Sequence, residues 1–264
     1  MNRIDKKFRE LKKQKKPALI VYITAGYPNL SKTKELILEI EKGGADIIEL
    51  GIPFSDPLAD GPTIQLASQR ALKNNVSLES VISLVKDIRK KTHIPLVFMT
   101  YYNPVFHYGV AGFVKEAARA GVDGVIIPDL PPEEAGALIK SAKKEKFATI
   151  FLLTPTSVRK RMKLVSKAST GFVYYVSLTG TTGARHLLPT DLKNKLRSIK
   201  RCTKNPVCVG FGVSSPSQAA EISKSADGVI VGSAIIDLMH KNIGKKDMVR
   251  KIAGFVRRLK NAMR

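Results

Sequence analysis

Residues 18–50 read ALIVYITAGYPNLSKTKELILEIEKGGADIIEL, and this stretch decides the fold. It opens with an apolar run of strand length, continues with apolar residues at helical spacing, and ends in a second apolar run. Continuous Val- and Ile-rich strands that flank a helix are typical of a parallel sheet whose outer face is covered. The stretch therefore predicts a strand–helix–strand unit with parallel strands.

The same alternation runs along the whole chain. Strand-length apolar segments occupy residues 18–24, 45–50, 95–100, 122–128, 147–153, 171–176, 206–210 and 227–231. Helical patterns occupy about 31–43, 62–74, 77–91, 110–120, 132–145, 157–168, 190–200, 215–224 and 245–263, with one more, 2–14, before the first strand. This order predicts an α/β fold, a (β/α)8 TIM barrel with an extra N-terminal helix, in which residues 1–264 form a single domain.

A doubly wound open sheet is the alternative architecture for alternating strands and helices. In that fold a GxGxxG motif would follow the first strand, but residues 25–30 read AGYPNL. The glycine motifs of this chain come late, after the sixth, seventh and eighth predicted strands, which is where barrels place them. The barrel is therefore favoured.

Length and composition agree with one globular enzyme domain. The chain has 264 residues, of which 44% are hydrophobic, and this is enough for one substantial core. No stretch approaches the roughly 20 apolar residues of a membrane span, and the basic N-terminus lacks the apolar run of a signal peptide. Cys202 and Cys208 match neither a zinc spacing nor a disulfide framework. We expect a soluble, cytoplasmic protein with reduced thiols and no membrane partner.

The chain is strongly basic, with 45 Lys and Arg against 22 Asp and Glu and a net charge of +23. Such a field raises the local concentration of anions, which include phosphate esters, nucleic acids and acidic membranes. Nucleic-acid modules usually concentrate cations beside aromatic platforms, whereas here they are spread over nearly every helical segment. Solvated helix faces are the favoured interpretation, and a nucleic-acid partner is not expected.

Glu49 is the first candidate for chemistry, because active sites of parallel barrels lie at the carboxyl ends of the strands. It lies near the end of the second predicted strand and should point to the same side as Ile47. If that side is the barrel interior, desolvation raises its pKa, which suits a group that accepts and returns a proton near neutral pH. A structural acid held by a hydrogen bond or salt bridge is the alternative.

The loop after the same strand, residues 51–65, reads GIPFSDPLADGPTIQ and contains three prolines and two glycines. Such a loop is stiff and can hold side chains in place. Asp56 and Asp60 are both available for chemistry, but either could instead cap the helix that begins near Pro62.

Three glycine turns follow the last three predicted strands, at Gly180-Thr181-Thr182-Gly183, Gly210-Phe211-Gly212-Val213-Ser214 and Gly232-Ser233-Ala234. Each alone indicates only a tight turn. Together, their backbone N–H groups and the N-terminus of a short helix at Ser233 predict a phosphate-binding cradle.

Two other kinds of chemistry are disfavoured. A Schiff-base aldolase needs a lysine on a strand that faces the site, and none of the strand segments contains one. A metal site is not expected either, because His93, His107, His186 and His240 are scattered with no pair at ligand spacing. Acid–base catalysis by carboxylates is what remains.

In this order, the motifs resemble those of the tryptophan synthase α-subunit family. The resemblance rests first on residues 49–65, ELGIPFSDPLADGPTIQ. Further matches, which cover essentially the whole chain, are Thr24-Ala25-Gly26-Tyr27-Pro28, Tyr102-Asn103-Pro104-Val105-Phe106, Pro128-Asp129-Leu130-Pro131, Gly183-Ala184-Arg185, Gly210-Phe211-Gly212 and Gly232-Ser233-Ala234.

The resemblance implies a lyase of tryptophan biosynthesis that cleaves indole-3-glycerol phosphate by a retro-aldol reaction to indole and glyceraldehyde 3-phosphate. It implies no cofactor in this subunit. The indole would pass to a pyridoxal-phosphate-dependent β subunit in an α2β2 tetramer. Contacts to that partner are implied for Pro53, Asp56, Asn103, Pro104 and the neighbourhood of 129–132.

The resemblance also implies residue roles. Glu49 would take a proton from the glycerol hydroxyl and help to protonate indole C3, and Asp60 would bind the indole N–H and stabilise positive charge on the ring. The implied binding residues are Tyr22, Tyr174 and Phe211 at the indole, Gly183, Gly212, Gly232 and Ser233 at the phosphate, and Thr182, which would contact Asp60 when loop 177–190 closes. The family more commonly has Phe where this chain has Tyr22, and the adjacent Tyr175 leaves the register of Tyr174 open.

Two alternative functions share this framework. One is a free-standing lyase that releases indole instead of passing it on, which an intact β-contact loop argues against. The other is an allosteric binding subunit whose own chemistry has decayed, which the presence of both Glu49 and Asp60 argues against.

Overall fold

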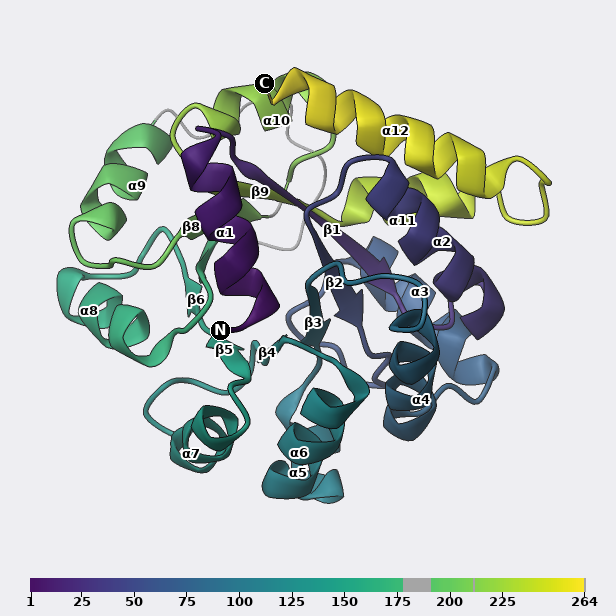
Figure 1. Cartoon of the computed structure of the whole chain (residues 1–264), viewed down its shortest axis with the longest axis horizontal. Coiled ribbons are helices and arrows are strands. Elements are labelled where there is room, and N and C mark those ends of the chain that lie inside the picture. The colour runs from purple at the N-terminus through teal and green to yellow at the C-terminus, as the bar shows by residue number, and fades with distance from the viewer. Residues whose placement is uncertain (178–190, 211, 264) are drawn as a thin grey trace.

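The chain is built around a ring of parallel strands with helices on its outside (Figure 1). The structure, a computed structural model, describes residues 1–177, 191–210 and 212–263. The strands are β1 (Ala18–Thr24), β2 (Ile47–Gly51), β3 (Leu96–Met99), β4 (Gly124–Ile126), β5 (Ala148–Ile150), β6 (Leu152–Leu153), β7 (Val173–Val176), β8 (Val207–Gly210) and β9 (Gly228–Val231).

Helices follow the strands along the chain and pack around the ring. They are α1 (Arg3–Lys13), α2 (Leu30–Lys42), α3 (Pro62–Lys73), α4 (Leu78–Ile88), α5 (Tyr102–Tyr108), α6 (Val110–Ala120), α7 (Gly136–Lys144), α8 (Arg159–Ala168), α9 (Leu192–Lys200), α10 (Pro216–Ser223), α11 (Ser233–His240) and α12 (Met248–Ala262).

The predicted eight-stranded barrel is confirmed, with one strand divided in two. The sheet order is β5-β4-β3-β2-β1-β9-β8-β7-β6, so its two ends, β5 and β6, are neighbouring parts of the predicted strand 147–153. They are separated by Phe151, whose carbonyl oxygen accepts the Tyr174 N–H at 3.1 Å. The ring therefore closes through this one interrupted strand.

Element boundaries agree with the sequence predictions to within three residues, apart from α5 and the start of α7. The seven-residue helix α5 was not predicted, because Pro104 and Gly109 make residues 102–109 look like a loop. Helix α7 begins at Gly136 instead of 132, since Pro131 and Pro132 precede a turn.

The extra N-terminal helix is confirmed, and it covers the amino-terminal end of the barrel (Figure 1). Its apolar face buries Ile4, Phe8 and Leu11. The Phe8 ring lies 6.0 Å from the ring of Phe172, which directly precedes β7. The opposite end of the barrel, at the carboxyl ends of the strands, is thus the end left for a site.

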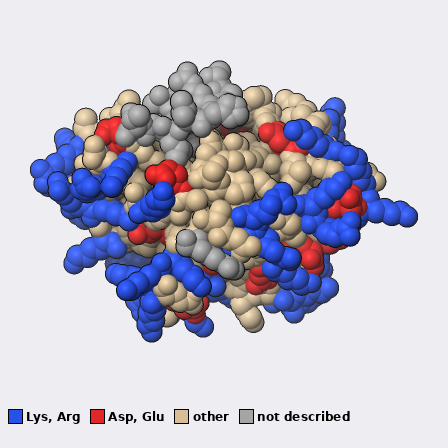
Figure 2. Space-filling model, turned by 90° about the horizontal axis from the view of Figure 1, so that it is seen from above, with Lys and Arg blue, Asp and Glu red and all other residues tan. Residues whose placement is uncertain are grey.

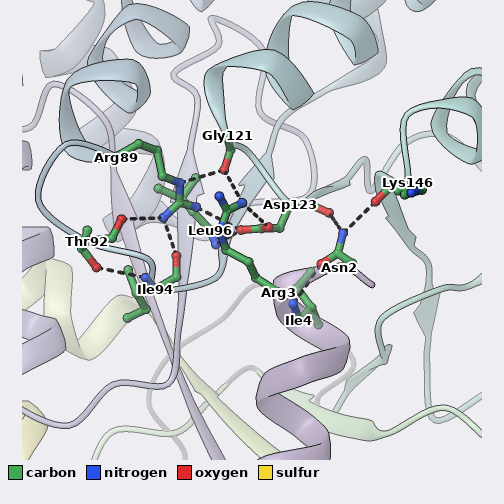
Figure 3. Close-up of polar contacts among 10 residues, drawn as sticks. All are labelled: Asn2, Arg3, Ile4, Arg89, Thr92, Ile94, Leu96, Gly121, Asp123 and Lys146. Atoms are coloured by element: carbon green, nitrogen blue, oxygen red, sulfur yellow. Dashed lines mark hydrogen bonds and ion pairs between the residues drawn. The ribbon is translucent and has the colours of Figure 1, made fainter.

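Polar contacts at the amino-terminal end converge on Asp123, which is 4% exposed (Figure 3). Its carboxylate accepts hydrogen bonds from Arg3, Arg89 and the Leu96 N–H, each at 2.9 Å. The Asn2 amide donates to the main-chain oxygens of Asp123 and Lys146, at 2.6 and 2.9 Å. The first turn of α1 is therefore fixed to the strands that it covers.

Basic residues are spread over the outer helices instead of forming one patch, as Figure 2 shows for the side of α12. The described loops that follow the strands contain no Lys or Arg but do contain acids, namely Asp56, Asp60, Asp129, Glu133, Glu134 and Asp191. Arg161 at the start of α8 pairs with Glu133 at the same end of the barrel. Among the residues described, no helix is both long and apolar enough to cross a membrane.

Candidate active site

Glu49 lies inside the barrel near the carboxyl end of β2, beside Tyr22 of β1 and Val97 of β3 in the sheet register. It is 1% exposed, and its Oε2 atom has no hydrogen-bond partner among the described residues. Burial, followed by the nearby charge of Asp60, raises the pKa of Glu49 to about 8. Among the described residues, Glu49 forms no salt bridge, so the alternative of a structural acid held by an ion pair is excluded.

Asp60 approaches the same space from the loop between β2 and α3. It is 6% exposed, its Oδ2 accepts a hydrogen bond from the Tyr101 hydroxyl at 3.0 Å, and its Oδ1 has no partner among the described residues. Burial raises the pKa of Asp60 to about 6, although the Tyr101 hydrogen bond acts in the opposite direction. The mouth therefore contains two buried carboxyl groups, each with an oxygen free to meet a ligand.

The loop that carries Asp60 is tied down at several points. The Phe54 main chain exchanges two hydrogen bonds with the Ser68 hydroxyl of α3, at 2.9 and 3.1 Å. The Gln65 amide donates to the Asp60 carbonyl oxygen at 2.9 Å, and the Ala59 N–H donates to the Tyr101 hydroxyl at 3.0 Å. These bonds explain how a loop without secondary structure holds a carboxylate in one place.

The capping alternative for Asp56 and Asp60 is wrong. The N-cap of α3 is Gly61, with Pro62 at the first helical position and no side-chain capping hydrogen bond. The fixed φ of proline starts the helix without a cap. Asp60 therefore keeps its side chain for the barrel mouth, and Asp56 is exposed in the same loop.

Tyr22 and Tyr174 enter the mouth from β1 and β7, and both are buried. A Cβ on Gly51 would come within 2.2 Å of the Tyr22 hydroxyl, and one on Gly210 within 2.4 Å of the Tyr174 hydroxyl. Each ring thus lies over a glycine of the neighbouring strand, which leaves room for a tyrosine at position 22. Burial raises both tyrosine pKa values, and Glu49 and Asp60 add to the rise for each.

The register question at the tyrosine pair is answered by the neighbours of each ring. Glu49 is the charged group with the largest effect on the pKa of Tyr174, whereas Asp191, next to α9, has that effect on Tyr175. Tyr174 therefore faces the barrel interior and Tyr175 the outer helices.

The predicted phosphate cradle is described only in part. Gly212 follows β8 with a positive φ of 80°, and Gly232 follows β9 as the N-cap of α11, whose first residue is Ser233. Because β8 and β9 are paired, these turns are adjacent at the mouth. Thr182, Gly183, Phe211 and nearly all of loop 177–190 lie outside the described residues.

An apolar hollow of about 410 Å³ opens beside the Asp60 loop. Ala59, Ile127, Leu130, Phe151 and Val176 contribute to its lining. Its size lies within the range of small-molecule pockets, and aromatic ligands suit such a lining. The sequence reading missed this hollow because its residues come from four separate loops and strands.

Tyr101 is the polar site residue that the sequence reading missed. It is 4% exposed and lies two residues after the end of β3. That place at the carboxyl end of a strand is the only feature of the sequence that indicates a site residue. No group of three or more His, Cys, Asp or Glu side chains that could hold a metal ion occurs in the part of the chain that the structure describes.

Comparisons with known proteins agree with this geometry. The family model described as "Tryptophan synthase alpha chain" matches residues 8–264. A tryptophan synthase alpha chain of Geotalea daltonii is 50% identical over 260 residues, which are 98% of each chain. That of a Thermoanaerobacter species is 46% identical over 263 residues, with complete coverage of both chains.

Solved structures give the same result. Tryptophan synthase subunit alpha of Legionella pneumophila superposes with a TM-score of 0.93 at 38% identity, over 100% of this chain and 98% of that one. A chain of Mycobacterium tuberculosis tryptophan synthase gives 0.92 at 35% identity, with the same coverage. The barrel, the two buried carboxyl groups in its mouth and these full-length matches lead to one conclusion: the chain belongs to the tryptophan synthase alpha chain family.

Proposed function

We propose that Glu49 and Asp60 are the catalytic residues with which this chain performs its family's reaction. That reaction is the retro-aldol cleavage of indole-3-glycerol phosphate to indole and glyceraldehyde 3-phosphate, a lyase step of tryptophan biosynthesis. One observation carries the residue assignment: two buried carboxyl groups with raised pKa values, about 8 and about 6, each have an oxygen without a partner among the described residues.

Glu49 is the proton carrier in this proposal. Cleavage breaks the bond between indole C3 and the glycerol carbon, so C3 must gain a proton and the adjacent hydroxyl must lose one. A carboxyl group with a pKa of about 8 can give and take protons near neutral pH, whereas an ordinary glutamate stays ionised. Glu49 protonates C3 and accepts the hydroxyl proton as the carbonyl of the aldehyde forms.

Asp60 has a complementary role. Protonation at C3 places positive charge on the ring, and its N–H becomes more acidic. A carboxylate that accepts this N–H stabilises the charge where it develops. With a pKa of about 6, Asp60 is ionised at neutral pH, and its Oδ1 is available for the N–H.

The remaining assignments concern binding. We assign Tyr22, Tyr174 and Phe211 to the indole ring, and Gly183, Gly212, Gly232 and Ser233 to the phosphate, whose oxygens would accept main-chain N–H groups. Thr182 would contact Asp60 when loop 177–190 closes. The paired strands β8 and β9 support the phosphate assignment for Gly212, Gly232 and Ser233.

The α chain works without a cofactor of its own, and its partner is the β subunit, which carries the pyridoxal phosphate and takes up the indole. We propose an α2β2 tetramer. We assign Pro53, Asp56, Asn103, Pro104 and residues 129–132 to the β contact, supported by the exposure of Leu58 (88%) and Phe106 (67%) at the same end of the barrel.

We further propose that residues 1–264 form one domain and that the protein works in the cytoplasm. The first is supported by one continuous apolar core that includes residues from α1 to α12. The second is supported by Cys202 and Cys208, which are both free thiols, as is usual in reducing compartments.

The assignment is tested by indole release from indole-3-glycerol phosphate. Glu49→Gln should fold and bind substrate but lose at least about 10³-fold in kcat, because Gln cannot move a proton. Asp60→Asn should lose less, about 10²-fold, because an amide still accepts the N–H. Wild-type turnover in Glu49→Gln would refute the proton-carrier role, and an unchanged rate in Asp60→Asn would refute the electrostatic one.

The free-standing alternative is tested in the same assay by adding a purified β subunit. We expect faster cleavage and no free indole when β subunit and serine are present. An unchanged rate with all indole released would favour the free-standing lyase, and light scattering of the mixture gives the stoichiometry.

A further inference from the structure

The Tyr101 hydroxyl uses both of its hydrogen-bonding functions on the loop that carries Asp60. It accepts the Ala59 N–H at 3.0 Å and donates to Asp60 Oδ2, also at 3.0 Å. The Tyr101 hydroxyl oxygen therefore holds both the Asp60 carboxylate and the main chain of the preceding residue, Ala59. Asp60 Oδ1 is left over for another donor.

The Tyr101 ring is itself fixed. It stacks on Phe54, with ring centroids 5.3 Å apart and an interplanar angle of 28°. Tyr101 is also the N-cap residue of α5, and the N–H of the next residue, Tyr102, donates to both carboxylate oxygens of Asp129 at 3.0 and 3.1 Å. The ring of Tyr101 is therefore held by Phe54, and its backbone is held through Tyr102 by Asp129.

We propose that Tyr101 is a positioning residue for the reaction, whose hydroxyl keeps the Asp60 carboxylate ionised and aims its free oxygen at the indole N–H. This inference rests on the proposed role of Asp60. It extends that role to a residue that need not touch the substrate. It also links Asp60 through α5 to Asp129, which lies in the face assigned to the β subunit.

The hydrogen bond from Tyr101 opposes the effect of burial on the Asp60 carboxylate. Among the described residues, the titratable groups that interact with Asp60 are Glu49, Tyr22, Tyr101 and Tyr174, and none of them is a cation. Burial raises the pKa of Asp60, and the Tyr101 hydrogen bond is the influence that lowers it. A donor to an ionised carboxylate stabilises the charged form more than the neutral one.

The test is the pH dependence of kcat and KM for indole-3-glycerol phosphate in wild type and Tyr101→Phe. The variant keeps the ring and its stack on Phe54 but loses the donor. We expect kcat/KM to fall about tenfold at pH 6 and about twofold at pH 8.5, since without the donor Asp60 ionises at a higher pH. Because Glu49 titrates in both proteins, most of its own pH dependence cancels in the ratio of variant to wild type, and the remainder reports Asp60 together with its influence on Glu49.

Tyr102→Phe is the matched control. That ring packs on Phe106 at 5.8 Å, and the substitution removes a neighbouring hydroxyl without touching the Asp60 loop. Its ratio to wild type should stay near one at every pH. In an Asp60→Asn background, Tyr101→Phe should lose its pH-dependent effect, because the group that titrates is absent.

A binding measurement separates this inference from the proposed reaction. Indole-3-propanol phosphate lacks the glycerol hydroxyls and cannot be cleaved, so its Kd reports binding alone. By calorimetry, Tyr101→Phe should weaken its binding about tenfold at pH 6 and much less at pH 8.5. A pH-independent ratio in both assays would overturn the role of Tyr101. Failure of the wild type to release indole would instead overturn the proposed reaction.

Discussion

At the scale of single residues, burial of Glu49 makes its ionised form unfavourable in the folded chain. A carboxyl group with a pKa of about 8 in the folded chain and an ordinary value in the unfolded chain binds more protons when folded. The contribution of Glu49 to the free energy of unfolding is therefore highest below its unfolded-state pKa and falls as the pH rises toward about 8. The property that makes Glu49 useful for proton transfer also weakens the fold under mildly alkaline conditions.

Glu49→Gln should remove this penalty. At pH 8.5 we expect the variant to be more stable than wild type by roughly 3–5 kcal/mol, and at pH 5 by only about 1 kcal/mol, because Glu49 is then protonated in the folded chain but mostly ionised in the unfolded one. Urea unfolding followed by circular dichroism at the two pH values measures the difference. Glu35→Gln is the control, since that exposed acid on α2 has only a surface ion pair with Lys32. Equal stabilities at pH 8.5 would contradict a buried, poorly solvated Glu49.

A site residue can be predicted from the sequence when the pattern that places it lies in its own strand or loop. Glu49 could be predicted, because strand alternation and a place at a strand end are properties of the strand itself. The loop pattern alone leaves Asp60 between catalysis and capping, the resemblance implies its role at the indole N–H, and the backbone at Gly61 excludes capping. Tyr101 could not be predicted, since its partners Ala59 and Asp60 lie about 40 residues earlier in the chain.

At the scale of elements, α1 is held to the barrel by contacts of unequal strength. The Asp123 side chain is 3% exposed and accepts from two guanidinium groups, whereas the Arg3 side chain is 40% exposed and the Arg89 side chain 10%. A buried charge that loses its partner costs much more than an exposed one. The inner pair between Arg89 and Asp123 should therefore dominate.

Substitutions at this network should separate the two contributions. Asp123→Ala should lower the free energy of unfolding by about 3–5 kcal/mol, because it leaves the buried Arg89 guanidinium without a counter-ion and the Leu96 N–H without an acceptor. Arg89 keeps its hydrogen bonds to the main-chain oxygens of Gly121 and Ile94. Arg3→Ala should cost only about 1 kcal/mol, since water replaces much of its contact. Chemical denaturation gives both values, and indole release should change little in Arg3→Ala. Equal losses would mean that α1 docking, not the buried pair, sets the stability.

Most elements follow from the sequence because their periodicity is strong. Apart from β5 and β6, every strand agrees with a predicted segment to within two residues at each end, which reflects the continuous apolar runs. The interruption at Phe151 and the short helix α5 had no such signal. Both depend on how the chain closes the ring and on where Tyr102 finds a partner in Asp129.

At the scale of the whole molecule, charge is divided by location. The net charge is +23, yet the described loops at the mouth contain only acids among their charged residues. The long-range field attracts a phosphate ester, while the acids of these loops act against it at short range, apart from Glu133, which is paired with Arg161. Which of these acts depends on ionic strength, because the Debye length is about 30 Å at 0.01 M and about 8 Å at 0.15 M.

Substrate capture should therefore be sensitive to salt. Between 10 and 150 mM NaCl we expect kcat/KM to fall about three- to tenfold while kcat changes little, since screening removes the distant cations first. Steady-state indole release over a salt series is the measurement. Binding of indole, which is neutral, serves as the control and should not respond. A salt-independent kcat/KM would show that the helix charges do not influence substrate entry.

The position of α1 has a consequence for synthesis on the ribosome. Asn2 binds main-chain oxygens of Asp123 and Lys146, which are 121 and 144 residues further along the chain. At about 5–20 residues per second, α1 leaves the ribosome roughly 6–30 seconds before its docking partners exist. During that interval Ile4, Phe8 and Leu11 form an exposed apolar stripe on a basic helix. Helix α1 thus has to wait for segments made later before it can dock, and nascent chains halted before residue 123 should be the form that chaperones recognise at this helix.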